Sequence, residues 1–140
     1  MSEEILLHTD GAAKGNPGPA GIGYVAFNRK GARLFEGYRY IGEATNNVAE
    51  YTAFIEGLTA VLERGFSRMR VASDSQLLVH QLHGLYKVKH PNLKPLFDRA
   101  VTLIEQCEHI EISHVPREQN AHADALANRA IEAHSGAGET

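Results

Sequence analysis

The sequence predicts an α/β fold in which helices pack on a mixed five-stranded sheet, with three antiparallel strands followed by two parallel ones. Two observations support this prediction. Three apolar segments joined by polar or glycine-rich turns open the chain, and a helical pattern of apolar residues then leads to a fourth strand. Short turns join antiparallel neighbours, whereas a helical crossover returns the chain parallel to a strand already in the sheet.

The first three strands are expected within the first 41 residues. Ile5–Thr9 is a short apolar run, and Gly23–Phe27 and Arg33–Ile41 are two further apolar segments. Glycine and proline are frequent in Gly11–Pro19, so we expect a long turn there. A polar turn at residues 28–31 joins the second and third strands.

A helix is predicted over about residues 47–64, because small and apolar residues share one helical face and Gly65 supplies a stop. The strand Arg70–Ser73 arrives by this crossover. The remaining elements are expected in this order: a short helix at Ser75–Leu82, a basic connector at Tyr86–Pro95, a helix near 93–104, a strand near 110–114 and a last helix over about 121–133.

Length and composition limit the class of protein. With 140 residues and 43% hydrophobic content, the chain is long enough for one domain and too short for two ordinary ones. We expect one domain over residues 1–133 and a disordered tail over 134–140. No apolar run approaches the ~18 residues of a membrane span and no signal-peptide pattern is present, so we expect a cytoplasmic protein without membrane contact. The lone Cys107 lies in a helical apolar pattern, which favours a buried thiol.

Two aspartates each follow an apolar strand of similar character. Asp10 comes after Ile5–Thr9, and Asp74 comes after Arg70–Ser73. If these strands are parallel neighbours, ~4.8 Å apart, the two carboxylates lie side by side at one edge of the sheet. Like charges this close are unfavourable unless a proton or a cation joins them. A shared Mg²⁺ is a natural solution, because it prefers oxygen ligands.

Two further acids are expected at the same point. Glu50 lies one turn into the first long helix, and Asp124 lies in the first turn of the last helix. Four carboxylates without cysteine or an obligatory histidine suit magnesium or manganese rather than zinc. Two such ions activate a water molecule and stabilise the leaving oxygen of an in-line phosphodiester displacement.

The chain resembles the type 1 ribonuclease H family (ribonuclease HI, with a ribonuclease H-like fold) from about Leu6 to Ile131. Four ordered blocks carry the resemblance: TDGAAKGNPGPAG, TNNVAEY, SDSQLLV and HVPREQNAHADALAN. The resemblance implies an endonuclease that hydrolyses the RNA strand of RNA–DNA hybrids and leaves 5′-phosphate and 3′-hydroxyl ends. It also implies two Mg²⁺ ions per active site with substrate, with Mn²⁺ as a substitute. We expect a monomer with no obligatory protein partner.

Residue roles follow from the same resemblance. It implies that Asp10 bridges both metals, that Asp124 completes the one that binds the attacking water, and that Glu50 and Asp74 complete the one at the leaving 3′ oxygen. His114 matches a histidine that assists turnover and product release. An imidazole exchanges protons near neutral pH.

Amide side chains near the acids are candidate substrate contacts. The 2′-hydroxyl that distinguishes RNA from DNA is both donor and acceptor, and amides have both capacities. The resemblance places matching positions in the minor groove of the hybrid and implies a contact to a DNA-strand phosphate for Thr45, while glycines let backbone amides approach the RNA. The expected substrate-binding residues are Gly11, Gly15, Asn16, Thr45, Asn46, Asn47 and Gln76, with Lys87 and Lys89 for phosphate contact.

The connector departs from part of the family. Some members carry an extra helix and a long basic loop there, whereas this chain has the compact YKVKHPNLK. The formal net charge of −3 excludes a wholly basic surface, but nucleic-acid binding needs only a local patch. We therefore expect modest, strongly salt-dependent affinity for long hybrids. The connector could also be an ordinary soluble segment.

Simpler interpretations exist for each residue. Asn47 and Glu50 could form a helix N-cap and its N3 partner. Asp74 and Asp124 could be first-turn acids favoured by the helix dipole, and His114 could be a hydrogen-bonded strand-end histidine. Arg117 is expected to brace its loop against Glu118 or a backbone carbonyl, and the other histidines, His122 included, are expected on the solvated surface.

Two other functions remain open at this stage. One is a hybrid-binding module without activity, which the clustered carboxylates disfavour because a phosphate must sit there. The other is a metal nuclease of the same fold that acts on double-stranded RNA or another duplex. The amide set favours a substrate with at least one RNA strand.

Overall fold

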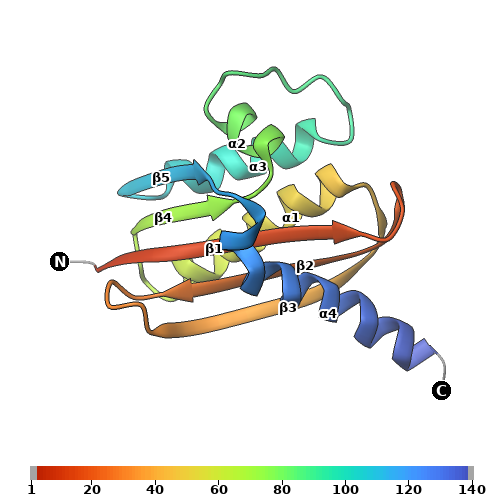
Figure 1. The fold of residues 1–140 in the computed structure, drawn as a ribbon. Coiled ribbons are helices and arrows are strands. Elements are labelled where there is room, and N and C mark those ends of the chain that lie inside the picture. Colours follow the sequence, from red (N-terminus) through yellow and green to blue (C-terminus); the bar gives the residue numbers. More distant parts are fainter. Residues whose placement is uncertain (1–2, 139–140) are drawn as a thin grey trace.

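One mixed five-stranded sheet organises the molecule (Figure 1). In this computed structural model, which describes the backbone of residues 3–138, the strands are β1 (Glu4–Ala13), β2 (Gly18–Phe27), β3 (Arg33–Ala44), β4 (Arg68–Ser73) and β5 (His109–His114). Their order is β3-β2-β1-β4-β5. The β1–β2 and β2–β3 pairs are antiparallel, and the β1–β4 and β4–β5 pairs are parallel. The predicted sheet is therefore confirmed.

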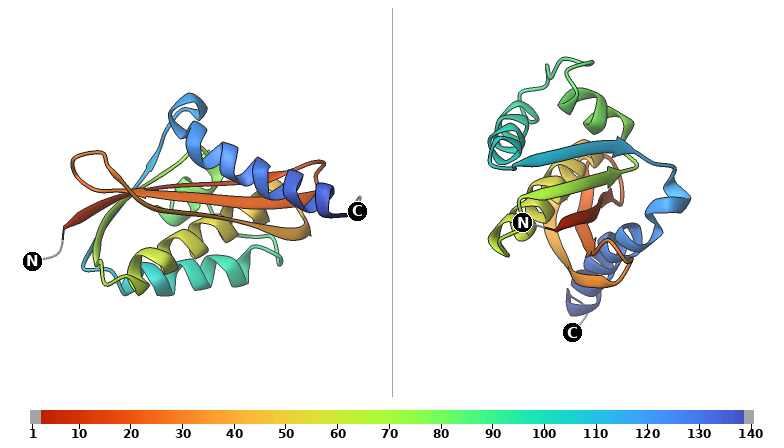
Figure 2. Two further views of the ribbon diagram at one scale, coloured as in Figure 1. Left: turned by 90° about the horizontal axis from the view of Figure 1, so that it is seen from below. Right: turned by 90° about the vertical axis from the view of Figure 1, so that its left-hand side faces the viewer.

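Helices cover both faces of the sheet. They are α1 (Asn46–Glu63), α2 (Gln76–Leu82), α3 (Lys94–Glu105) and α4 (Ala121–Gly138), with a short 3₁₀ turn, η1 (Arg117–Asn120), before α4. Figure 2 shows α4 on one face, where it packs on β1, β2 and β3, and α1 with α3 on the opposite face. The core lies between the sheet and α1, and its largest buried side chains include Ile5, Leu7, Tyr51, Phe54 and Leu58. Within residues 3–138, no helix has the length and apolar character needed to cross a membrane.

The first hairpin is tighter than the sequence predicted. β1 continues through Asp10 to Ala13, β2 already begins at Gly18, and Ala13 pairs with Ala20. The expected long turn over Gly11–Pro19 is thus wrong, and only residues 14–17 lie outside the strands. Gly11, which suggested a turn, lies within β1, and a Cβ on it would lie 2.2 Å from the carbonyl carbon of Ala49 in α1. Gly15 lies in the turn itself, and a Cβ on Gly18 would lie 2.2 Å from the carbonyl oxygen of Lys14.

The last helix is longer than predicted. It extends to Gly138, so most of the expected disordered tail at 134–140 is helical, while Glu139 and Thr140 lie outside the described residues. A contact to the edge strand supports the extension: the His134 ring stacks on the Tyr40 ring of β3, with centroids 3.6 Å apart and 5° between planes. A sequence pattern that treats the helix alone cannot detect this partner.

Candidate active site

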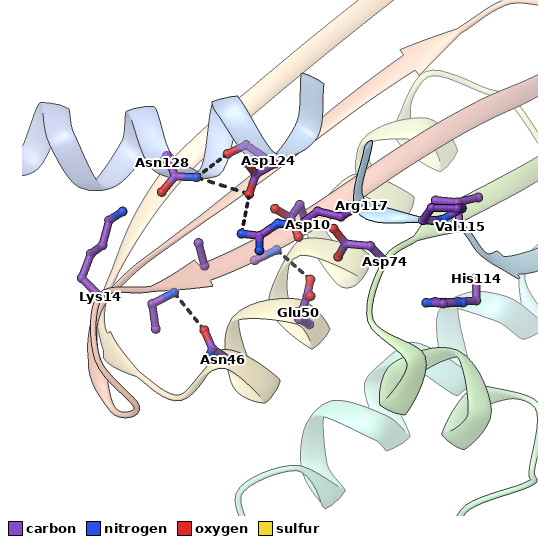
Figure 3. Close-up of a pocket in the computed structure, with 14 residues that line it drawn as sticks. Asp10, Lys14, Asn46, Glu50, Asp74, His114, Val115, Arg117, Asp124 and Asn128 are labelled. Carbon is purple, nitrogen blue, oxygen red and sulfur yellow. Dashed lines mark hydrogen bonds and ion pairs between the residues drawn. The ribbon is translucent and has the colours of Figure 1, made fainter. Parts of the chain in front are cut away.

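A cavity of about 560 Å³ opens where β1 and β4 meet the first turns of α1 and α4 (Figure 3). All four predicted carboxylates line it, from four different elements or their ends: Asp10, Glu50, Asp74 and Asp124. His114 lines the same cavity from the end of β5. The remaining lining residues are Gly11, Ala12, Ala13, Lys14, Asn46, Val115, Pro116, Arg117 and Asn128.

The parallel pairing of β1 with β4 brings the first two aspartates together. Thr9 is opposite Ser73 in the register, so Asp10 and Asp74 come next to each other directly after that pair. Each of Asp10, Asp74 and Glu50 has a carboxylate oxygen within 4.8 Å of the others. This juxtaposition is the one expected for acids at neighbouring strands, although Asp10 lies inside its strand rather than at its end.

Glu50 reaches this point because α1 contacts β1 at backbone distance. The Gly11 N–H donates to Glu50 Oε1 over 2.7 Å. A Cβ on Gly11 would lie 2.2 Å from the carbonyl carbon of Ala49, which is far too close for any side chain. Gly11 therefore allows the first turn of α1 to seat its carboxylate beside Asp10. The helix is capped by the Thr45 side chain, which accepts from the Val48 N–H at 3.2 Å, so the suggested Asn47 cap is wrong.

Burial and mutual repulsion change the acidity of two of these groups. The pKa of Asp10 is raised to about 10, first by burial and then by the charges of Glu50 and Asp74, with a further contribution from Asp124. Burial also raises the pKa of Glu50 to about 8, against the lowering effect of the Gly11 N–H. Without a bound cation, the folded protein therefore keeps a proton on this carboxylate cluster. A hard divalent cation fits such a set of carboxylate oxygens.

Asp124 is oriented by its neighbours at the start of α4. Asn128 Nδ2 donates to the Asp124 backbone oxygen at 2.9 Å and to Oδ1 at 3.3 Å. Arg117 Nη2 lies 3.9 Å from the same Oδ1, with 80% of the Arg117 side chain exposed. The expected partner of Arg117, Glu118 or a backbone carbonyl, is thus wrong, because the arginine extends over the cavity toward Asp124.

Two of the predicted amides hold the first hairpin against α1. Asn16 Oδ1 accepts from the Asn46 N–H at 3.0 Å, and Asn46 Oδ1 accepts from the Ala13 N–H at 3.1 Å. Because both oxygens face backbone donors, the two side-chain NH₂ groups point elsewhere and remain potential donors. Asn46 lines the cavity, and Asn16 is linked to it through this pair.

The other predicted substrate residues lie outside the cavity lining. Gly15, Asn47 and Gln76 are exposed, and Thr45 is half-buried at its cap position. Lys87 and Lys89 are exposed on the connector between α2 and α3, which Figure 1 shows as a long arch away from the sheet. Their contact with a nucleic acid stays a prediction.

Four residues at or beside the site were not singled out as functional from the sequence. Lys14, Arg117 and Asn128 line the cavity, and Asn120 is fully buried just before α4. Only Asn128 carried a usable signal, because a residue four positions after Asp124 lies on the same helical face. Lys14 lies in the segment interpreted as a turn, and the partners of Asn120 are more than 100 residues away.

Comparisons with known proteins agree with this geometry. The family described as "Reverse transcriptase-like" matches residues 8–130. "Ribonuclease HI" of Halobacterium salinarum is 44% identical over 91% of this chain and 64% of its own length. "Ribonuclease H" of Dechloromonas aromatica is 37% identical over 93% of this chain and 95% of its own length.

Solved structures show the same fold. The RNase H1 of Halobacterium salinarum superposes with a TM-score of 0.90 at 42% identity, covering 92% of this chain and 98% of that one. LC11-RNase H1, solved in complex with an RNA/DNA hybrid, gives 0.87 at 46% identity, covering 91% and 96%. The chain is also 43% identical to "Bifunctional protein Rv2228c" of Mycobacterium tuberculosis. The match covers 93% of this chain but only 36% of the length of that relative.

Proposed function

Since this chain belongs to the type 1 ribonuclease H family, we propose that it is an endonuclease that hydrolyses the RNA strand of RNA–DNA hybrids, leaving 5′-phosphate and 3′-hydroxyl ends. The observation that carries the proposal is the carboxylate cluster, with oxygens of Asp10, Glu50 and Asp74 within 4.8 Å of one another in an open cavity. A site built only to bind a polyanion gains nothing from four acids at one point.

We propose that Asp10, Glu50, Asp74 and Asp124 hold two Mg²⁺ ions with substrate, or Mn²⁺ in their place. Such ions supply an activated water and stabilisation of the leaving oxygen. The protein contributes the rigid placement of the ligands. Gly11 orients Glu50, and Asn128 orients Asp124. Asp10 lies in β1, between β4, which leads into Asp74, and β2, on which α4 packs, so it is the residue best placed to serve both ions.

Recognition of RNA is assigned to the amides beside the cluster. The NH₂ groups of Asn16 and Asn46 can donate to a 2′-hydroxyl, because their oxygens are already occupied by backbone donors. Gly15, Asn47 and Gln76 extend this surface, with Thr45 assigned to a DNA-strand phosphate. Lys87 and Lys89 would contact phosphates irrespective of sequence. Lys14 and Arg117 place positive charge directly in the cavity lining.

His114 is proposed to assist turnover. It is exposed at the end of β5 and lines the cavity. Its imidazole can exchange a proton at the reacting phosphate or help the product leave. His114→Ala should slow turnover while Mn²⁺ binding to the protein without hybrid stays intact, which separates this role from that of the carboxylates.

Cleavage of labelled substrates tests the assignment. RNA–DNA hybrid, double-stranded RNA and double-stranded DNA are each incubated with Mg²⁺ or with a chelator. We expect cutting of the RNA strand of the hybrid with Mg²⁺ and none with chelator. Equal cutting of all three would instead indicate a general duplex nuclease, and binding of the hybrid without cutting would indicate an inactive binding module.

The cellular setting is part of the same proposal. We propose that the protein acts in the cytoplasm as a monomer, with the hybrid as its partner and no obligatory protein partner. Light scattering of the purified chain, with and without a short hybrid, tests the monomer. A dimer in either sample would contradict it.

A further inference from the structure

The side chain of Asn120 is a fully buried polar group with no place in the chemistry described above. Its Nδ2 donates to the carbonyl oxygen of Thr9 at 2.9 Å, and its Oδ1 lies 3.0 Å from His8 Nδ1. The donation to a carbonyl fixes the amide orientation, so His8 Nδ1 must carry the proton shared with Oδ1. Both halves of the amide are therefore occupied.

These two bonds join distant parts of the chain directly beside the site. Thr9 immediately precedes Asp10 in β1, and side chains alternate along a strand, so His8 and Asp10 share one face. Asn120 ends η1 and lies four residues before Asp124, on the same side of the helix that follows. The amide thus ties the start of α4 to β1 at the point where Asp124 must meet Asp10.

The other end of the same loop is tied in an equivalent way. The Val115 N–H donates to the carbonyl oxygen of Ser73 at 2.9 Å, and Ser73 immediately precedes Asp74. The segment from Val115 to Asn120, which carries Arg117, is therefore fastened at both ends. Each fastening uses the backbone carbonyl just before an aspartate of the cluster.

The rest of α4 has its own support. Ala123, Leu126 and Ala127 are buried against β2, where Gly21 and Gly23 let the helix backbone approach the strand. Removal of the Asn120 amide should therefore leave the helix docked but free to shift at its first turn. That turn contains Asp124.

We propose that Asn120 is a positioning residue that sets the placement of Asp124 relative to Asp10 by clamping η1 to β1. The inference rests on the proposed metal-dependent activity. Asn120 acts through the backbone and does not touch the substrate. A small displacement of a catalytic group is enough to reduce turnover strongly.

The test compares Asn120→Ala with a matched control, Asn28→Ala. Asn28 also makes two side-chain hydrogen bonds, at 2.9 Å each to the N–H groups of Lys30 and Ala32, but in the remote β2–β3 turn. Cleavage of hybrid gives kcat and KM separately, and calorimetry measures Mn²⁺ binding to the protein without hybrid. Melting temperature reports the general loss of stability in both variants.

For Asn120→Ala we expect kcat to fall about 10- to 100-fold with KM unchanged. The affinity for Mn²⁺ should fall about 10-fold, as for other residues that orient metal ligands. Asn28→Ala should melt earlier yet keep both values. An Asn120→Ala protein with the kcat and Mn²⁺ affinity of the control would overturn the proposal.

A second variant keeps the test decisive if Asn120→Ala does not fold. His8→Phe removes one of the two amide bonds and keeps a ring packed edge-on against Phe27. We expect a smaller loss of kcat and of Mn²⁺ affinity in the same direction, and no loss at all would overturn the proposal. If the wild type binds Mn²⁺ but does not cut hybrid, the proposed function fails, while the effect of Asn120 on Mn²⁺ affinity still decides this inference.

Discussion

The Asp10 side chain is almost fully buried, with 3% of its surface exposed, and three other carboxylates surround it. Such an arrangement destabilises the metal-free protein, because buried like charges are relieved only by protons or cations. For Asp10→Asn we expect loss of hybrid cleavage with Mg²⁺. In chelator at pH 7, the free energy of unfolding should rise by an amount on the order of 1–3 kcal/mol, measured by urea denaturation.

A carboxylate outside the cavity provides the control for this variant. Asp98 in α3 is exposed and pairs with Lys94 at 2.7 Å. Asp98→Asn should keep cleavage and change stability little, since exposed ion pairs contribute at most about 1 kcal/mol. A large loss of metal-free stability in Asp10→Asn would show that the Asp10 carboxylate stabilises the fold, contrary to this expectation.

The raised pKa values also predict how metal-free stability depends on pH. In an unfolded chain Asp and Glu lose their protons near pH 4. In the folded protein, burial and the neighbouring carboxylates raise the pKa of Asp10 to about 10, and burial raises that of Glu50 to about 8, so the cluster keeps protons that the unfolded chain has already lost. Across this window the folded state binds more protons than the unfolded state, so its free energy of unfolding falls as pH rises.

Urea denaturation in chelator at pH 5, 7 and 9 measures this dependence. The wild type should lose stability from pH 5 to 9 more steeply than Asp10→Asn, because the variant lacks the main titrating group. Saturating Mn²⁺ should flatten the wild-type curve by replacing the proton with a cation. Parallel curves for the two proteins without metal would contradict the assignment of the raised pKa to Asp10.

At the scale of elements, the close contact between β1 and α1 decides where Glu50 lies. For Gly11→Ala, the new Cβ would overlap the Ala49 backbone, so α1 must move away from the strand. We expect the free energy of unfolding to fall by about 1–3 kcal/mol, which is typical of overpacking. The rise in melting temperature on adding Mn²⁺ should also shrink, because Glu50 is displaced with the helix.

Gly31→Ala is the matched control for this variant. Gly31 has φ of +85° in the β2–β3 turn, with nothing within 4 Å of a Cβ. The strained backbone should lower the free energy of unfolding by about 1–2 kcal/mol, which is close to the loss expected for Gly11→Ala. Its response to Mn²⁺ should match the wild type. If both variants respond to Mn²⁺ alike, the contact at Gly11 does not position the site.

For the whole molecule, the sequence predicted the sheet and the four carboxylates, because each signal is local. An apolar strand, a helical period and an acid at their junction lie within a few residues of one another. Parallel pairing of two such strands then brings Asp10 to Asp74 without further information. Glu50 and Asp124 are predicted near the same point because each lies near the start of a helix, whereas their exact placement depends on contacts with Gly11 and Asn128.

The features that the sequence did not reveal depend on contacts between distant residues. β1 continues past Asp10 by pairing with β2, and Gly11, which looks like a turn residue in isolation, is a glycine because α1 leaves no room for a side chain there. The extended α4 has Tyr40 as a stacking partner, and Asn120 finds His8 at a separation of 112 residues. No local pattern encodes such pairs.

The distribution of charge over the whole molecule suggests how it would hold a hybrid. The chain has a formal net charge of −3, and four of its 17 acidic residues line the cavity, whereas Lys87 and Lys89 are exposed on the α2–α3 connector. Binding that depends on a few phosphate contacts weakens steeply with salt. The logarithm of hybrid affinity should therefore fall linearly with the logarithm of salt concentration.

The double variant Lys87→Ala/Lys89→Ala tests whether the connector supplies two of these contacts. We expect the slope of that line to become shallower by about 2, one for each lysine removed, as measured by fluorescence anisotropy across a salt series. Turnover at saturating hybrid should persist, because neither lysine lines the cavity. Lys30→Ala, in the exposed β2–β3 turn, is the control and should keep the wild-type slope. An unchanged slope in the double variant would mean that the connector only links two helices and does not contact the hybrid. A shallow slope in the wild type would mean that phosphate contacts contribute little to binding.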